Sequence, residues 1–176
     1  MKTRKIGRWN VTPMGLGCMP LSGLPHSRIN MLDDRPAAIG VIHAALDAGV
    51  RLLDTADIYS AYWDQFGHNE VLVGEAVRSW SGTPEQKKEI LVATKGGITR
   101  GPGETWGRAA SVDYLLRAAE ASALRLGVDQ IDLWQHHRLD PTIAFETQFE
   151  NTLVLKERGL VREIGVSNYN AKQLSI

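Results

Sequence analysis

The chain is poor in the features that mark secreted, membrane-bound or nucleic-acid-binding proteins. Its one cysteine, Cys18, cannot form an internal disulfide, and a buried, unreactive thiol in a reducing cytoplasm is the ordinary context for such a residue. The 20 basic and 20 acidic residues cancel, and no basic stripe is present, so we expect neither nucleic acid nor an anionic membrane as a partner.

Long apolar runs are missing as well. None approaches the roughly 20 residues that a membrane-spanning helix needs. The basic residues at the start of the chain are not followed by the apolar stretch of a signal peptide. We therefore expect no membrane association and a cytoplasmic location.

What the chain does contain is typical of a globular protein. Of its 176 residues, 43% are hydrophobic and 23% are charged. That length suffices for one domain with a substantial core, and no linker or low-complexity stretch divides it. The sequence thus predicts a single domain over residues 1–176.

Strand-like and helix-like segments alternate along the chain. A short hairpin is expected over residues 4–11. Strands are expected at 14–19, 52–56, 90–95, 131–137 and 161–167, and helices at 36–48, 70–80, 111–126 and 142–158, with a further helical segment from Asn170. Ser111 is the expected N-cap of its helix, and Gly127 the expected stop. A strand–helix repeat of about 30 to 40 residues predicts parallel strands joined by right-handed crossovers.

Polar residues close several of these strands or follow them directly. Asp54 ends one strand, Lys95 the next and His137 a third, while Tyr59 lies in the loop after Asp54. In a barrel of parallel strands the C-terminal ends form one face, where catalytic groups gather. The two-residue periodicity of a strand places Asp54, Lys95 and His137 on the inner face and His136 on the helix-facing side.

These four residue types together can donate a proton. A phenol has a pKa of about 10, and a nearby ammonium lowers that pKa. A carboxylate would hold the ammonium, and a neutral imidazole can orient a carbonyl oxygen. Each residue alone more often has a structural role, for example Asp54 as a turn cap. Their recurrence at three successive strand ends favours a proton-donating site built on Tyr59.

The same residues belong to an ordered set of motifs that closely resembles the aldo-keto reductase family. The motifs are Gly15-Leu16-Gly17, Leu53-Asp54-Thr55-Ala56-Asp57-Ile58-Tyr59, Asn69-Glu70 leading to Gly74, Ala93-Thr94-Lys95, Ile131-Asp132-Leu133-Trp134-Gln135-His136-His137-Arg138 and Ile164-Gly165-Val166-Ser167-Asn168. The likeness runs from the N-terminal hairpin to the last residue. His136 departs from it, since relatives usually carry an apolar residue there.

The resemblance implies an α/β fold, the (β/α)8 TIM barrel, and the reduction of a small aldehyde or ketone by NADPH, or less often NADH. It assigns Tyr59 as general acid, Asp54 and Lys95 as the pair that tunes it, and His137 as the carbonyl orienter. Ser167 and Asn168 are assigned to the nicotinamide carboxamide, with Asp54 also near the cofactor.

Only part of such a barrel is accounted for. The hairpin and five strands are present, whereas strands six to eight and the nucleotide-holding loops that the family places after them are not. Barrels of this kind have typically about 250 residues. We therefore expect a partial barrel with open sheet edges through which the chain could self-associate. A truncated gene product, a shortened version and a fragment of a longer reading frame all remain open.

The sequence also contains features of other functional sites. A Rossmann dinucleotide site is disfavoured because Pro20 replaces the third glycine of Gly15-Leu16-Gly17-Cys18-Met19-Pro20. A metal site at His136, His137 and Asp140 is disfavoured because adjacent strand residues face opposite ways, and no metal is expected. A non-catalytic regulatory or binding subunit and an inactive fragment stay open.

The substrate itself is not identified by the sequence. Leu24 and His26 in the first long loop, Trp106 in the third, and Arg138 directly after His137 are candidate pocket residues. The loops after the strands are long, as expected where a barrel keeps its substrate pocket.

Overall fold

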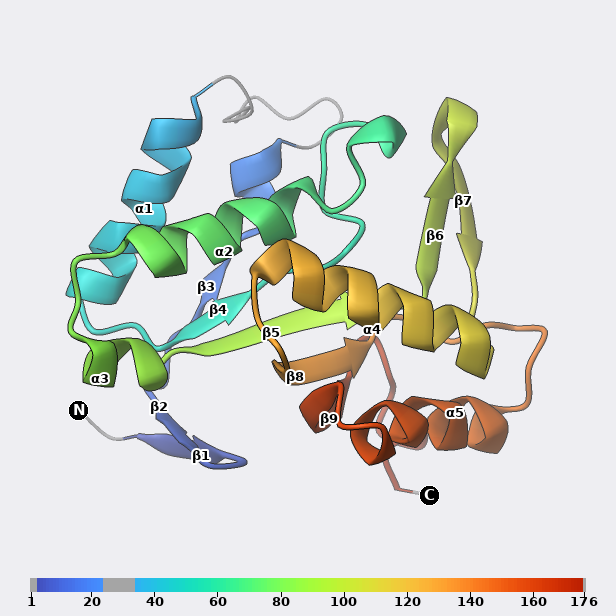
Figure 1. Ribbon diagram of the computed structural model, residues 1–176. Helices are drawn as coiled ribbons and strands as arrows, with labels where there is room; N and C mark the ends of the chain where they lie inside the picture. The colour runs from blue at the N-terminus through green and yellow to red at the C-terminus, as the bar shows by residue number, and fades with distance from the viewer. Residues whose placement is uncertain (1–2, 24–33, 176) are drawn as a thin grey trace.

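Five parallel strands form the central sheet of the computed structural model, which describes residues 3–23 and 34–175 (Figure 1). The strand order follows the chain, and every neighbouring pair is parallel. The strands are β3 (Leu16–Gly17), β4 (Leu52–Asp54), β5 (Leu91–Gly96), β8 (Ile131–His136) and β9 (Val161–Val166). β3 and β9 have no further strand on their outer sides among the described residues, so the sheet is not closed, as expected for part of a (β/α)8 barrel.

The helices that connect these strands build the main core against one face of the sheet. They are α1 (Arg35–Asp47), α2 (His68–Ser79), α4 (Val112–Leu126) and α5 (Phe145–Glu157). Buried residues of all four helices join strand residues such as Leu53 and Trp134 in one apolar cluster. The connecting helices therefore lie on the outer side of the partial barrel, as the repeat predicted.

A smaller cluster lies on the inner face of the sheet, near the start of the strands. The predicted N-terminal hairpin is confirmed as β1 (Arg4–Ile6) and β2 (Trp9–Val11), which pair antiparallel. Trp9 and Val11 pack with Leu91, against Leu52 and Leu133. The hairpin thus covers the end of the sheet opposite to the polar strand ends.

Helix boundaries follow local capping. Ser111 caps α4 by accepting a hydrogen bond from the Tyr114 amide (3.4 Å), and Gly127 (φ 73°) ends that helix, both as predicted. α5 starts at Phe145 rather than at residue 142, since Asp140 accepts hydrogen bonds from the Thr142 amide and hydroxyl and keeps that stretch a turn. The helical segment expected from Asn170 is a turn only over residues 171–174.

A second hairpin, β6 (Ile98–Gly101) and β7 (Thr105–Arg108), stands where only a loop was expected (Figure 1). The 3-10 turn η3 (Pro102–Glu104) joins the two strands, and Gly103 (φ 68°) takes the left-handed conformation that this reversal requires. Two other 3-10 turns, η1 (Met19–Ser22) and η2 (Trp63–Gln65), and the short α3 (Pro84–Lys88) were also not predicted.

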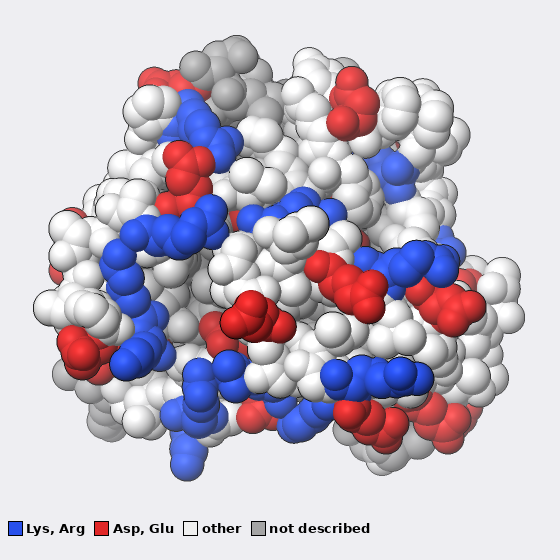
Figure 2. Space-filling view, viewed as in Figure 1, with Lys and Arg blue, Asp and Glu red and all other residues white. Residues whose placement is uncertain are grey.

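Charged residues of both signs are interspersed on the face shown in Figure 2. No helix of the described ranges is long and apolar enough to cross a membrane. Within the same ranges, no three His, Cys, Asp or Glu side chains are grouped so that they could hold a metal ion.

Candidate active site

The polar strand ends meet at the C-terminal edge of the sheet. Asp54 is the last residue of β4, Lys95 lies near the end of β5, and His137 directly follows β8. The Gln135 side-chain amide donates to Asp54 Oδ1 (3.3 Å), so the inner faces of β4 and β8 turn toward each other across β5. Strand periodicity and parallel register together bring these residues to one place.

Lys95 links the other members of the group. Its Nζ donates to Asp54 Oδ2 (2.7 Å), to the Thr55 carbonyl (2.9 Å) and to the Tyr59 hydroxyl (3.1 Å). Only 5% of the residue is exposed, and a buried ammonium is tolerated because these oxygens surround it. The Tyr59 phenol therefore has a cation at hydrogen-bond distance.

His137 lies against the same phenol. The two rings are 5.8 Å apart between centroids and meet edge to face at 80°. Burial, with further contributions from Lys95, Arg138 and Arg108, lowers the pKa of His137 to about 3. The imidazole is consequently neutral near neutral pH and can donate one hydrogen bond.

His136 lies apart from this group, on the side predicted for it. Its Nδ1 and the Tyr169 hydroxyl are hydrogen-bonded (2.6 Å), and the residue is buried. Ile131 departs from the two-residue alternation of the strand, which would put it on the inner face with Leu133. It packs with the buried residues on the helix side of the sheet and lines a small hollow with residues of α2 and α4.

A hollow opens beside Tyr59 and His137 at this edge of the sheet. Trp106 and Arg138, both predicted from the sequence as candidate pocket residues, line it. Arg108 was missed, although it follows Trp106 at the two-residue spacing of one strand face. The lining residues are Met19, Ile58, Tyr59, Ile98, Trp106, Arg108, His137, Arg138 and Asn168. Leu24 and His26 lie outside the described residues.

The loop that carries Tyr59 is tied to the β6–β7 hairpin by Arg100, which the sequence analysis also missed. The guanidinium donates to the Ser60 carbonyl (2.8 Å), the Ser60 hydroxyl (3.0 Å) and the Ala61 carbonyl (2.8 Å). Glu104 pairs with the same guanidinium (2.5 Å) and accepts from the Trp63 amide (3.0 Å). The backbone directly after Tyr59 is thus held at three positions.

A buried pair of carboxyl groups lies behind the same loop. Glu70 accepts from the Thr94 hydroxyl (2.5 Å) and from Arg125 (2.6 Å), and it is fully buried. Asp57 is 1% exposed, and neither of its carboxyl oxygens has a partner among the described residues. Burial, reinforced by the charge of Glu70, raises the pKa of Asp57 well above its usual value.

Ser167 and Asn168 follow β9. The Asn168 side-chain amide donates to the His137 carbonyl (3.1 Å) and to the Ser167 hydroxyl (3.0 Å). Asn168 takes a left-handed backbone conformation (φ 62°) and lines the hollow. A hydroxyl and an amide beside the hollow are groups with which a carboxamide can form hydrogen bonds, so this pair fits the nicotinamide end of the expected cofactor.

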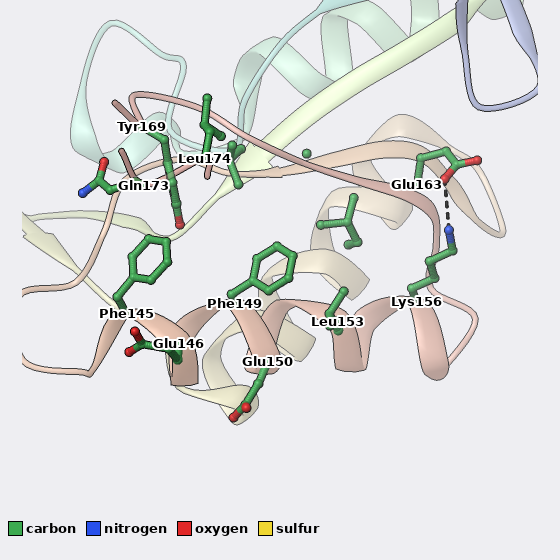
Figure 3. A pocket seen from close by; sticks show the side chains of 13 residues that line it. Phe145, Glu146, Phe149, Glu150, Leu153, Lys156, Glu163, Tyr169, Gln173 and Leu174 are labelled. Carbon is green, nitrogen blue, oxygen red and sulfur yellow. Dashed lines mark hydrogen bonds and ion pairs between the residues drawn. The ribbon is translucent and has the colours of Figure 1, made fainter. Parts of the chain in front are cut away.

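A larger groove, of about 520 Å³, lies away from this site (Figure 3). It runs between α5 and β9, with Phe145, Phe149 and Leu153 on one side and Tyr169 and Leu174 on the other. None of Asp54, Tyr59, Lys95 and His137 lines it. The groove is therefore separate from the candidate active site at the strand ends, although it is larger than the hollow there.

Comparison with known proteins agrees with the fold. The family model of the aldo/keto reductase family matches residues 13–176, and the chain belongs to this family. It is 41% identical over 142 residues to a 6-dehydroglucose reductase of Novosphingobium aromaticivorans, covering 78% of this chain and 43% of that protein. It is 34% identical over 166 residues to an uncharacterised oxidoreductase of Schizosaccharomyces pombe, covering 94% of this chain and 49% of that one.

Solved structures give the same family. An aldo-keto reductase from Bacillus halodurans superposes with a TM-score of 0.74 at 32% identity, covering 95% of this chain and 50% of that one. A glycerol dehydrogenase from Gluconobacter oxydans has a TM-score of 0.81 at 29% identity, covering 99% and 51%. The chain thus spans about half the length of the relatives it matches.

Proposed function

We propose that the protein is an NAD(P)H-dependent oxidoreductase that reduces an aldehyde or ketone to an alcohol, with Tyr59 as the proton donor. The observation that carries this proposal is the position of Lys95 Nζ, which touches both the Asp54 carboxylate and the Tyr59 hydroxyl. An oxidoreductase role agrees with the family and with the names of the matched relatives.

The roles follow from the geometry. Lys95 Nζ donates to the Tyr59 hydroxyl and can stabilise the negative charge that develops on that oxygen as its proton leaves, while Asp54 holds the ammonium in place. His137, being neutral, can donate a hydrogen bond to the carbonyl oxygen that Tyr59 protonates. The proton moves from the Tyr59 hydroxyl to that oxygen, and the alcohol forms.

The reduced nicotinamide supplies the hydride when it is bound. Ser167 and Asn168 would hold its carboxamide, and Asp54 lies near the same edge of the sheet. NADPH is proposed ahead of NADH on the resemblance alone. A cytoplasmic location, proposed with it, agrees with the single cysteine, which is buried.

Two relatives suggest compounds for a first assay. One matched protein is named a reductase of 6-dehydroglucose and another a glycerol dehydrogenase. Small hydroxylated aldehydes are therefore reasonable first substrates beside simple aromatic ones.

The test is the Tyr59→Phe variant of a complete version of the protein, one that includes the remaining barrel strands. The change removes the hydroxyl and keeps the ring. We expect carbonyl-dependent NADPH oxidation to fall about 10²- to 10⁴-fold, the usual contribution of general acid catalysis. NADPH affinity should change little, since Tyr59 is not among the proposed cofactor contacts. Phe66→Leu, a change to another aromatic residue of the same loop, is the control. Turnover near that of the wild type in Tyr59→Phe would show that another group donates the proton.

A further inference from the structure

Two arginine side chains in the hollow beside Tyr59 pair with no carboxylate of residues 3–23 and 34–175. Arg108 ends β7 and Arg138 follows His137. Arg108 donates only to the carbonyl of its neighbour Gly107 (2.7 Å), and neither arginine takes part in an ion pair of the described residues. Among the described residues, no acidic side chain lines the hollow.

Other cations at this edge of the sheet are neutralised. Lys95 pairs with Asp54 (2.7 Å), and Arg100 pairs with Glu104 (2.5 Å). The hollow therefore carries positive charge that the described residues do not balance, although the whole chain has a formal net charge of zero. Like charges that share a partly apolar hollow repel each other, and a bound anion relieves that repulsion.

The two charges act at the place where the carbonyl is expected. Burial is the largest cause of the low pKa of His137, and the positive charges of Lys95, Arg138 and Arg108 lower it further. Arg108 and Arg138 therefore lie close enough to act on a molecule held against His137.

The hollow also has a flat apolar wall. Trp106 is 54% exposed, and the Arg100 guanidinium lies 4.8 Å from the centroid of its ring. The hydrogen bonds of Arg100 to the Tyr59 loop thus position Trp106 as well as the loop. Ile58 and Ile98 add apolar surface to the same wall. A ligand with an apolar body and an anionic end matches both features.

We propose that this hollow selects carbonyl substrates that carry a carboxylate or phosphate group, which Arg108 and Arg138 bind while the carbonyl lies at Tyr59 and His137. This inference rests on the proposed function, because it assigns the Tyr59 end of the hollow to the reacting carbonyl. A phosphate of the cofactor has the same chemistry. We assign the arginines to the substrate because neither lies in the segment that holds Ser167 and Asn168.

The experiment compares two probes that differ in one charge, 4-carboxybenzaldehyde and its methyl ester. Binding of each to the full chain is measured by calorimetry at low and at raised ionic strength. We expect the acid to bind about tenfold tighter than the ester at low salt, the size of effect that charge-assisted hydrogen bonds give. The preference should shrink as salt screens it.

Variants assign that preference to the arginines. Arg108→Gln and Arg138→Gln should each weaken binding of the acid and leave the ester unchanged, and Arg108→Lys should restore part of the preference. Arg117→Gln, at an exposed arginine of α4 that does not line the hollow, is the matched control. Equal binding of acid and ester by the wild type, or a preference that survives in the double glutamine variant, would overturn the proposal.

Two further measurements distinguish a substrate anion from a cofactor phosphate, and the anion site from the proposed function. In a complete version of the protein, which includes the remaining barrel strands, saturating NADPH should leave the preference intact. If NADPH abolishes it and binds more weakly to the glutamine variants, the arginines serve the cofactor and the inference is wrong. If the complete version prefers the acid without any NADPH oxidation, the anion site stands and the proposed function fails. Turnover with equal kcat/KM for acid and ester would support the proposed function and overturn the anion site.

Discussion

At the scale of single residues, the two adjacent histidines illustrate how strand periodicity divides roles. His137 lies edge to face with Tyr59, whereas His136 is hydrogen-bonded to Tyr169 on the helix side. Both imidazoles are largely buried, and burial lowers both pKa values, to about 3 for His137 and about 4 for His136. Their chemistry is alike, so position alone separates a proposed carbonyl orienter from a structural residue.

Alanine variants test this division. We expect His137→Ala to lower turnover strongly while the free energy of unfolding changes less. His136→Ala should lower the free energy of unfolding by about 1–3 kcal/mol, because it removes a buried ring and leaves the half-buried Tyr169 hydroxyl without its partner, and should largely spare turnover. Steady-state kinetics and urea unfolding on both variants decide the matter. The reverse pattern would contradict the assignment of faces.

A second prediction concerns Asp57 and pH. Burial raises the pKa of Asp57 above the value of about 3.9 in an unfolded chain, so the folded state holds this proton more tightly. The resulting stabilisation is present at low pH and is lost as pH rises through the folded-state pKa. Asp57→Asn cannot ionise. We therefore expect the variant to gain stability relative to the wild type between about pH 5 and about pH 8.

Urea unfolding of both proteins at these two pH values measures that change. The depressed pKa values of His136 and His137 have the opposite effect, since they lower stability as pH falls below about 6.5. Both proteins share these histidines, so their contribution cancels in the difference. A difference that does not depend on pH would mean that Asp57 keeps an ordinary pKa.

At the scale of elements, the β6–β7 hairpin is joined to the loop that carries Tyr59. Arg100 supplies the connection, with a side chain that is 1% exposed and hydrogen bonds to Ser60 and Ala61. The planar fork of a guanidinium can reach several oxygens at once, which a lysine ammonium cannot do with the same geometry. The loop position therefore depends on an element some 40 residues away in the sequence.

Arg100→Lys tests this dependence. We expect backbone amides of residues 60–63 to exchange hydrogen about tenfold faster, since charge-assisted hydrogen bonds are lost while the charge remains. Hydrogen exchange followed by mass spectrometry measures this, with Arg117→Lys as the control on α4. Unchanged exchange would mean that the loop is held by its own backbone contacts, such as that of the Asn69 amide with the Tyr59 carbonyl (3.1 Å).

At the scale of the whole molecule, the described sheet has two open edges. β3 and β9 each pair on one side only, and the apolar groove beside β9 lies next to one of these edges (Figure 3). Unpaired strand edges are templates for association. We therefore propose that residues 1–176, taken as a single domain, are marginally stable and self-associating, and that they bind NADPH weakly or not at all.

Size-exclusion chromatography and a fluorescence titration with NADPH test this prediction. We expect oligomers or aggregates and no saturable binding at micromolar NADPH. Phe149→Glu, which places a charge on the groove, should reduce association if the groove is the contact and have no effect if the strand edge is. A monodisperse monomer that binds NADPH at low micromolar concentration would show that the five-stranded piece is self-sufficient.

The sequence by itself determined the order of the elements, the parallel sheet and the residues that meet at its C-terminal edge. These properties depend on local patterns: apolar periodicity, helix caps such as Ser111 and stops such as Gly127, and polar residues at strand ends. Strand periodicity also assigned His136 and His137 to different faces, because adjacent side chains of a strand point to opposite faces of the sheet.

The tertiary structure decided the rest. It formed the β6–β7 hairpin, made Arg100 a tie to the Tyr59 loop and gathered Arg108 and Arg138 at one hollow. The tie of Arg100 and the meeting of Arg108 with Arg138 join residues far apart in the chain. The hairpin is local, but its short strands of mixed polarity carry no clear strand signal. The Asp57 carboxyl likewise became a perturbed acid only through its burial beside Glu70. Charge balance and burial are properties of the folded neighbourhood, so no local pattern in the sequence contains them.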